Sequence, residues 1–314
     1  MKQVCGHQAV EQRFVNSLSR GNLHHAWLLH GHKGVGKFTL AERLAAMLLC
    51  ETHDACGHCH GCKMLAAGSH PDVYSVALLE KKRDISIDQV RELLAFLALS
   101  GAESERRVVI LDNAERLNNQ AANALLKGLE EPSPGSLLFI VCADVDKLPA
   151  TVRSRCLLQH CAPLNDADVS HVLQMEFESA DERLLDFAVE MADGSPGAVT
   201  CLQDKKVSHA LLSWQEIVAD LANADIGKIE GWCRLHLATV PHTLIIRTLL
   251  LPLYPLLQRR NAESFEASEG LFKAAYGCMA WPGSVVRQSL RPAPSLLACL
   301  LELRHALRNS VIQR

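Results

Sequence analysis

The stretch LLHGHKGVGKFTLAERL, residues 28–44, decides the fold of this chain. A short apolar run leads into closely spaced glycines, and a segment with helical periodicity follows. The apolar positions of that segment recur on one helical face: Leu40, Leu44, Met47 and Leu48. A strand, a glycine loop and a helix in this order predict a phosphate-binding loop.

The loop departs from the phosphate-binding pattern G-x-x-x-x-G-K-[ST] at one position. Gly31, Gly36 and Lys37 fit it, but Phe38 stands where a hydroxyl would hold Mg²⁺. Backbone N–H groups around these glycines and Gly34 can still cradle phosphates, and Lys37 can still neutralise the β and γ oxygens. The loop therefore keeps its cradle and its charge without its metal-binding oxygen.

Two further apolar runs predict buried strands. They are RVVILD, residues 107–112, and SLLFIVCA, residues 136–143. Between them ANALLKGLEEP has a helical apolar stripe that Pro132 ends. Continuous apolar strands that alternate with helices indicate an α/β fold in which helices cover both faces of a parallel sheet.

The remaining groups of a nucleotide site are incomplete. Asp112, at a strand end, stands where a carboxylate would organise Mg²⁺, although it could instead only cap the next helix. Asn113 follows it, where a glutamate would activate water, and an amide takes no proton at neutral pH. Thr39 is a poor substitute for the missing hydroxyl, because successive helical residues point about 100° apart. Glu115, two residues after Asn113, is expected to lie out of line for activating water in place of the missing glutamate.

A cluster of cysteines follows the loop helix. Cys50, Cys56, Cys59 and Cys62 have the spacing C-x₅-C-x₂-C-x₂-C. Four thiolates can close a tetrahedron around Zn²⁺ and leave no open position for water, so the sequence predicts a structural zinc site in an insertion at residues 50–62. Nearby histidines at positions 53, 58 and 60 leave the identity of the fourth ligand open.

After Pro163 the sequence pattern predicts helices and no strands. Helices are predicted at residues 166–176 and 180–192, with a break at DGSPG, residues 193–197. Amphipathic helices continue to the end, as in Leu296, Leu300, Leu303 and Leu307. We expect an α/β domain over residues 1–162, a small helical domain over 163–205 and an all-helical domain over 206–314.

Composition narrows the class of protein. The chain has 314 residues, 48% of them hydrophobic and 21% charged, with a net charge of −3, which argues against a dedicated nucleic-acid binder. The N-terminus has no apolar core of a signal peptide, and prolines break the longest apolar run, residues 248–257. We therefore expect a cytoplasmic protein without a membrane span, whose 12 cysteines are thiols or metal ligands.

These motifs resemble the AAA+ subunits of bacterial DNA polymerase III clamp loaders. The matching segments cover about the first 200 residues: HHAWLLHGHKGVGK, the four cysteines, SHPDVY, ISIDQVREL, NAERLNNQAANALLKGLEEP, KLPATVRSRC and GSPGA. The resemblance implies a RecA-like domain with a zinc insertion, a helical lid domain and a helical collar domain that joins a five-subunit ring. It further implies that the other subunits of that ring are gamma or tau and delta, and that the complex loads the sliding clamp onto primer-template DNA.

The resemblance also implies which chemistry is lost and which is kept. The ATP-hydrolysing gamma and tau subunits carry Thr, Glu and Arg where this chain has Phe38, Asn113 and Gly197. The chain alone is thus expected to have little or no ATPase activity. The polymerase holoenzyme to which it is implied to belong transfers nucleotidyl groups. The retained Lys37 leaves ATP binding without hydrolysis open. Arg155, in the intact Ser-Arg-Cys motif, is implied to act as an arginine finger on ATP bound by a neighbouring subunit.

Two other functions stay open at this point. An active ATPase of the gamma or tau type would need Thr39 and Glu115 to replace the missing groups. A zinc-dependent nucleic-acid-binding protein would need basic and aromatic residues in alternation, and the sequence lacks that pattern. A non-hydrolysing stator that delivers an arginine to its neighbour is the function the motifs favour.

Overall fold

The computed structural model describes residues 4–80, 82–177, 180–255 and 265–312. The chain forms two compact units, one of Met1–Glu178 with Ala192–Ala198, and one of Ser179–Met191 with Val199–Arg314. The three-domain division expected from the sequence stays a prediction. No helix among the described residues has the length and apolar character that crossing a membrane requires.

The first unit is built on a five-stranded parallel sheet with the order β2-β3-β4-β1-β5. The strands are β1 (Ala26–His30), β2 (Val73–Val76), β3 (Arg107–Leu111), β4 (Ser136–Cys142) and β5 (Leu157–His160). Because all strands run in the same direction, the sheet has one carboxyl edge and one amino edge.

The three central strands confirm the sequence prediction, whereas the two edge strands were not predicted. β3 is buried along its whole length, and β4 and β1 almost so. By contrast β2 and β5 are short and half-exposed, with polar residues among the apolar ones. An edge strand packs less of its surface, so its sequence carries a weaker apolar signal.

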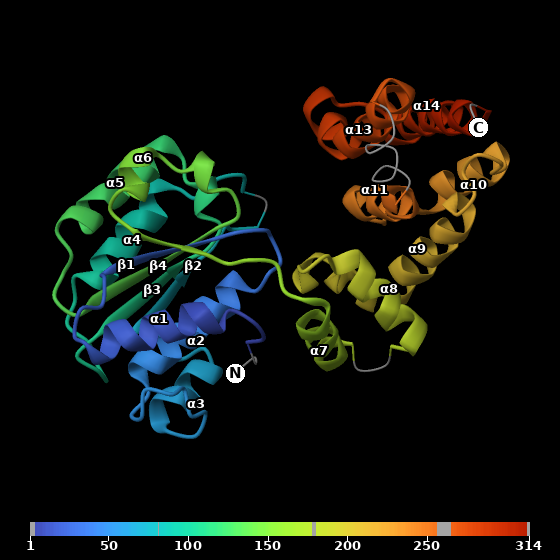
Figure 1. The fold of residues 1–314 in the computed structure, drawn as a ribbon. Helices are drawn as coiled ribbons and strands as arrows, with labels where there is room; N and C mark the ends of the chain where they lie inside the picture. Colours follow the sequence, from blue (N-terminus) through green and yellow to red (C-terminus); the bar gives the residue numbers. More distant parts are fainter. Residues whose placement is uncertain (1–3, 81, 178–179, 256–264, 313–314) are drawn as a thin grey trace. The chain divides into compact units, whose positions relative to one another are not determined.

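Helices cover both faces of this sheet, as predicted, with α1, α2 and α3 on one side and α4, α5 and α6 on the other (Figure 1). The helices are α1 (Gln8–Ser19), α2 (Lys37–Leu49), α3 (His60–Ala66), α4 (Ile87–Leu97), α5 (Asn119–Glu130), α6 (Ala150–Arg153) and α7 (Asp166–Glu176). Short 3₁₀ turns occur at η1 (Ala114–Arg116), η2 (Val145–Lys147) and η3 (Pro196–Ala198).

Alternation along the strands divides the core into two layers. Leu28 and Ile140 point toward α4 and α5, while Trp27 and Phe139 point toward α1 and α2. All four side chains are fully buried. Burial of each such side chain stabilises the fold by roughly 1.5–3 kcal/mol, so the two layers fix the strand ends from which the site loops depart.

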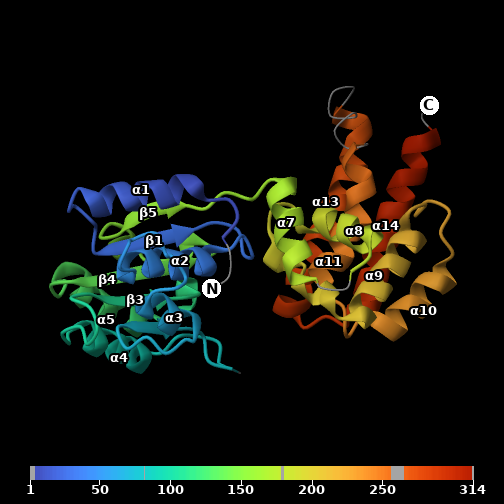
Figure 2. The same ribbon diagram turned by 90° about the horizontal axis from the view of Figure 1, so that it is seen from below.

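The second unit is helical. Its elements are α8 (Glu182–Ala192), η4 (Thr200–Gln203), α9 (Lys205–Val218), α10 (Ile226–His236), α11 (His242–Leu250), η5 (Leu251–Leu253), α13 (Phe265–Gln288) and α14 (Pro292–Ile312). The helices α13 and α14 pack side by side (Figure 2). The predicted leucine stripe of α14 is buried, and Trp214, Trp232 and Trp281 are also core residues.

Candidate functional site

The phosphate-loop lysine is bound to its own loop. Lys37 is buried in the first turn of α2, and its Nζ donates to the carbonyls of Gly31 at 2.8 Å and His32 at 2.7 Å. Burial lowers the pKa of Lys37, while the nearby Cys161 and Glu115 act in the opposite direction. The ammonium group therefore has protein acceptors at the position from which it would bind phosphate.

The same loop is packed against the turn η3. Gly197 N donates to Gly34 O at 2.9 Å. A Cβ on Gly34 would lie 2.7 Å from Ala198 N, and a Cβ on Gly197 would lie 2.8 Å from Gly34 Cα. On another side His7 Nε2 lies 2.8 Å from Val35 O. Backbone thus meets backbone at positions 34 and 197, and neither position has room for a side chain.

The other predicted loop residues have different surroundings. Gly31 lies so close to the carbonyl oxygen of Cys161 that a Cβ on Gly31 would overlap it. Gly36 is the N-cap residue of α2, and no atom lies within 4 Å of the position that its Cβ would take. Phe38 is half-buried and packs against the core layer under α1 and α2. Thr39 is half-buried in the first turn of α2. Phe38 thus serves packing at the position where a metal-binding hydroxyl would be needed.

The strand-end carboxylate is paired within its own loop. Asp112 accepts from the backbone N–H of Asn113 at 2.8 Å and from its side-chain amide at 2.7 Å. Burial raises the pKa of Asp112, and the Asn113 N–H opposes this. Asn113 adopts a left-handed backbone with φ 52°, and Glu115 accepts from Ala143 N at 3.1 Å. Glu115 is therefore engaged at the end of β4.

Arg155 lies at the opposite edge of the sheet, in the link between α6 and β5. Its side chain is 37% exposed, and Nη2 lies 2.7 Å from a carboxylate oxygen of Glu130. Nη1 donates to Thr151 O at 3.0 Å and lies 3.3 Å from Ser154 Oγ. Arg153, two residues earlier, instead pairs with Asp146 at 2.8 Å. The structure thus gives the two neighbouring arginines separate partners.

The four predicted cysteines come together between α2 and α3. Cys50 follows the last residue of α2, and Cys59 caps α3, where its Sγ accepts from Cys62 N at 3.4 Å. All four Sγ atoms lie within 4.8 Å of one another. The Sγ atoms of Cys50 and Cys59 are 3.9 Å apart, close to the edge of about 3.8 Å that a tetrahedron with Zn–S bonds near 2.3 Å requires.

The histidines near this cluster have other partners. Nδ1 of His53 lies 3.0 Å from Met47 O, and Nδ1 of His58 lies 2.9 Å from Cys56 O. Among the described residues, the group that could hold a metal ion here consists of the four cysteines. An all-thiolate set of this size suits a soft, tetrahedral ion, so the residues present fit a structural zinc.

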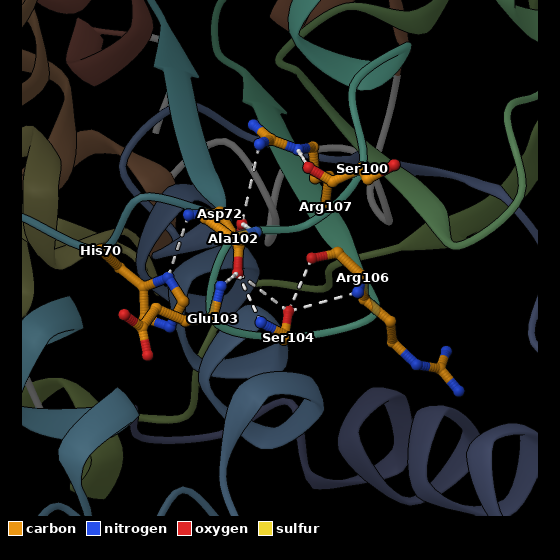
Figure 3. A network of polar contacts seen from close by, with 8 residues as sticks. All are labelled: His70, Asp72, Ser100, Ala102, Glu103, Ser104, Arg106 and Arg107. Atoms are coloured by element: carbon orange, nitrogen blue, oxygen red, sulfur yellow. Dashed lines mark hydrogen bonds and ion pairs between the residues drawn. The ribbon is translucent and has the colours of Figure 1, made fainter.

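A buried carboxylate organises the amino edge of the sheet. Asp72 is fully buried just before β2 and accepts from three successive backbone N–H groups, Ala102 at 2.6 Å, Glu103 at 2.9 Å and Ser104 at 2.8 Å (Figure 3). Burial alone would raise the pKa of Asp72, but these hydrogen bonds outweigh it and lower the pKa. Asp72 therefore pins the loop that precedes β3.

Two side chains extend this network to its surroundings. Arg107 donates from Nε to Ser100 O at 2.8 Å and stacks its guanidinium 4.5 Å over the ring of Phe96. His70 Nδ1 accepts from Asp72 N at 3.2 Å, and its Nε2 is close to Gly61 of α3. Through Asp72 and His70, the loop before β3 is thereby linked to α3, which carries Cys62.

Sequence reasoning missed several of these residues. His7, Asp72 and Glu130 were not singled out, although SHPDVY and GLEEP both belong to matched segments. A buried aspartate just before a strand is a recognisable signal, because it must find donors. The pairing of Glu130 with Arg155 carries no signal in a single sequence, since the two residues belong to different elements.

Comparisons with known proteins point to one family. A family described as "DNA polymerase III, delta subunit" matches residues 6–165. The chain is 41% identical to DNA polymerase III subunit delta' of Pseudomonas aeruginosa over 55% of its own length and 53% of that protein. It is 37% identical to the delta' subunit of Escherichia coli over 61% of its length and 58% of that protein. The chain thus spans about half the length of the curated relatives it matches.

More distant relatives share the fold. The tau subunit of Salmonella typhimurium is 31% identical over 71% of this chain and 36% of that protein. The crystal structure of a DNA polymerase III gamma subunit-related protein from Thermotoga maritima is similar with a TM-score of 0.50 at 17% identity, over 95% of this chain and 98% of the other. The expected AAA+ architecture, an α/β sheet unit followed by helices, is confirmed.

Proposed function

Since this chain belongs to the DNA polymerase III, delta subunit family, we propose that it is a clamp-loader subunit that does not hydrolyse ATP itself. It acts as a stator in the ring that opens and loads the sliding clamp on primed DNA. The relatives that support this role are the delta' subunits.

The observation that carries this proposal is the closed phosphate loop. Lys37 donates to its own loop, Gly34 packs against Gly197, and Phe38 replaces the Mg²⁺-binding hydroxyl. Asn113 takes the place of the water-activating carboxylate, and it holds Asp112 through two hydrogen bonds. Hydrolysis needs an ordered metal and an activated water, and Phe38 and Asn113 do not supply the groups for them, so this pocket lacks the means for turnover.

The chemistry that the chain delivers is assigned to Arg155. A half-exposed guanidinium at the rim of the sheet can reach a neighbouring subunit and stabilise the charge that develops on a transferring γ-phosphoryl group. Lysine offers no planar fork of donors for this purpose. Arg155 and the phosphate loop lie at opposite edges of the sheet. Arg155 can therefore act on the neighbouring subunit while the chain's own phosphate loop takes no part in hydrolysis.

The remaining assignments complete this role. Gamma or tau subunits and delta are the proposed neighbours in a five-subunit ring, joined through a collar domain over residues 206–314, while residues 163–205 form the lid domain. Zinc held by Cys50, Cys56, Cys59 and Cys62 would cross-link an insertion too small for a core of its own. A subunit of the replication machinery of this kind works in the cytoplasm.

The test is ATP hydrolysis by the reconstituted clamp-loader complex. Arg155→Ala in this chain should leave ring assembly intact and lower clamp-stimulated turnover at the neighbouring site by up to ~10³-fold. Arg153→Ala is the matched control, because that arginine pairs with Asp146, and its effect should be much smaller. Loss of assembly in Arg155→Ala, or unchanged turnover, would refute the assigned role.

A further inference from the structure

The guanidinium of Arg155 is held from two directions. One direction is local, from the carbonyl of Thr151 and the hydroxyl of Ser154. The other comes from a separate helix, where the Glu130 carboxylate lies 2.7 Å from Nη2. The local contacts share Nη1, so Glu130 is the partner that Nη2 has among the described residues.

Glu130 is a firmly placed support. It is the last residue of α5, whose preceding residue Leu129 is buried in the core. Two residues earlier Gly128 approaches the Leu94 side chain of α4 so closely that a Cβ would overlap it. Pro132 follows and prevents the helix from continuing. The carboxylate therefore starts from a backbone position that the sheet unit determines.

The held guanidinium keeps donors for another group. Arginine has five N–H donors, and among the described residues Nη1 makes two hydrogen bonds while Nη2 forms an ion pair with Glu130. Nε–H takes part in none of these contacts. Two donors on one side of a planar fork suit the bidentate recognition of phosphoryl oxygens.

The pair contributes little to stability because both side chains are substantially exposed, 37% for Arg155 and 51% for Glu130. The pair can still determine how the Arg155 guanidinium is oriented. A charged group that acts across an interface is effective only when its geometry is fixed before the reaction, and small misplacements are costly in rate. A contact that is weak for stability can therefore matter for turnover.

We propose that Glu130 is a positioning residue that orients the Arg155 guanidinium toward the ATP of the neighbouring subunit. This inference rests on the function proposed above and assigns a second residue to the same site. Glu130 does not touch the nucleotide in this mechanism, and it acts only through Arg155.

The test compares Glu130→Ala, Glu130→Gln and the control Glu131→Ala in the reconstituted complex. Glu131 is exposed and adjacent, and it differs in having no described side-chain partner. We expect Glu130→Ala to lower kcat at the neighbouring site roughly 10- to 100-fold with KM for ATP unchanged. Glu130→Gln should restore most of the rate because its amide oxygen can still accept from Nη2, and Glu131→Ala should match the wild type.

A double variant separates this inference from its premise. Glu130→Ala added to Arg155→Ala should cause no further loss, since Glu130 acts through Arg155. If Arg155→Ala alone has no effect, the proposed function fails. If Arg155→Ala lowers turnover but Glu130→Ala leaves it unchanged, only the positioning role is overturned. A higher rate in Glu130→Ala would also overturn it, because Glu130 would then restrain the arginine rather than orient it.

Discussion

The carboxyl and amino edges of the sheet differ in what their cations can reach. At the carboxyl edge Lys37 is buried and bonded to two carbonyls of its own loop, and Gly34 of the same loop packs against Gly197. At the amino edge Arg155 is half-exposed and paired with a single carboxylate. About 16 Å of strand separates the two edges.

Under the proposed function, this difference explains how a fold can be kept without its own reaction. The packing that shapes a phosphate loop also orders the strands and helices around it, so the loop has structural value without nucleotide. The guanidinium at the other edge needs only a rigid support and access to a neighbour. The proposed loss of turnover at one edge would therefore leave the other edge able to function.

The largest effect is expected from the proposed zinc site, which sharpens the comparison because its cysteines belong to neither the phosphate loop nor the Arg155 contacts. Cys59→Ser should abolish a zinc content of about one ion per chain and destabilise the module strongly, since structural zinc contributes about 10–16 kcal/mol of apparent binding free energy in small zinc domains. Metal analysis and thermal unfolding measure this.

The matched control for the zinc variant is Cys201→Ser, a half-buried cysteine outside the cluster, which should keep its metal. Wild-type protein that holds no metal and presents four freely titratable thiols at positions 50, 56, 59 and 62 would disprove the zinc site.

The next effect tests whether the carboxyl edge is closed by backbone packing. Gly34 and Gly36 both have positive φ, 91° and 95°, but only Gly34 has atoms near its missing Cβ. Gly36→Ala should cost about 1–2 kcal/mol of unfolding free energy from backbone strain alone. Gly34→Ala should cost about 1–3 kcal/mol more, because it also collides with the turn at Gly197.

Urea unfolding followed by circular dichroism compares these two variants directly. Equal losses for Gly34→Ala and Gly36→Ala would break the comparison, because the loop would then not be held against Gly197 in solution.

A smaller effect is expected at the amino edge, where Asp72 holds the loop before β3. The pKa of Asp72 is lower in the folded protein than in the unfolded chain. Its contribution is thus present above about pH 4 and is lost as the pH falls through the lower, folded pKa. Asp72→Asn should cost about 2 kcal/mol at pH 7, since it removes charge-assisted hydrogen bonds.

The pH dependence of unfolding checks the sign of this effect. The difference in stability between wild type and Asp72→Asn should shrink as the pH falls below about 4. A difference that stays constant between pH 7 and pH 2 would show that the carboxylate charge does not hold the loop.

The sequence predicts those parts of the molecule in which neighbouring residues carry the signal. The buried strands β1, β3 and β4, the bounds of α7 and the gathering of Cys50 through Cys62 all follow from local pattern and spacing. The helix α4 was not predicted, although Ser86 and Gln89 form a capping box, which is a sequence signal for the start of a helix.

Contacts between distant segments could not be predicted in this way. The close approach of Gly34 and Gly197 depends on where the chain returns after β5, and neither glycine signals the other. The separate pairing of Arg153 and Arg155 is a second example, because both belong to one short motif and only the tertiary structure gives them different carboxylates.

The central claim is that this chain keeps an ATPase fold without ATP turnover of its own. ATP hydrolysis by the purified chain tests it most directly, with Phe38→Thr combined with Asn113→Glu as the comparison. We predict no turnover for the wild type, and none for the double variant while Gly34 remains packed against Gly197. Turnover by the wild-type chain alone at ordinary enzymatic rates, about 1–10³ s⁻¹, would contradict the account.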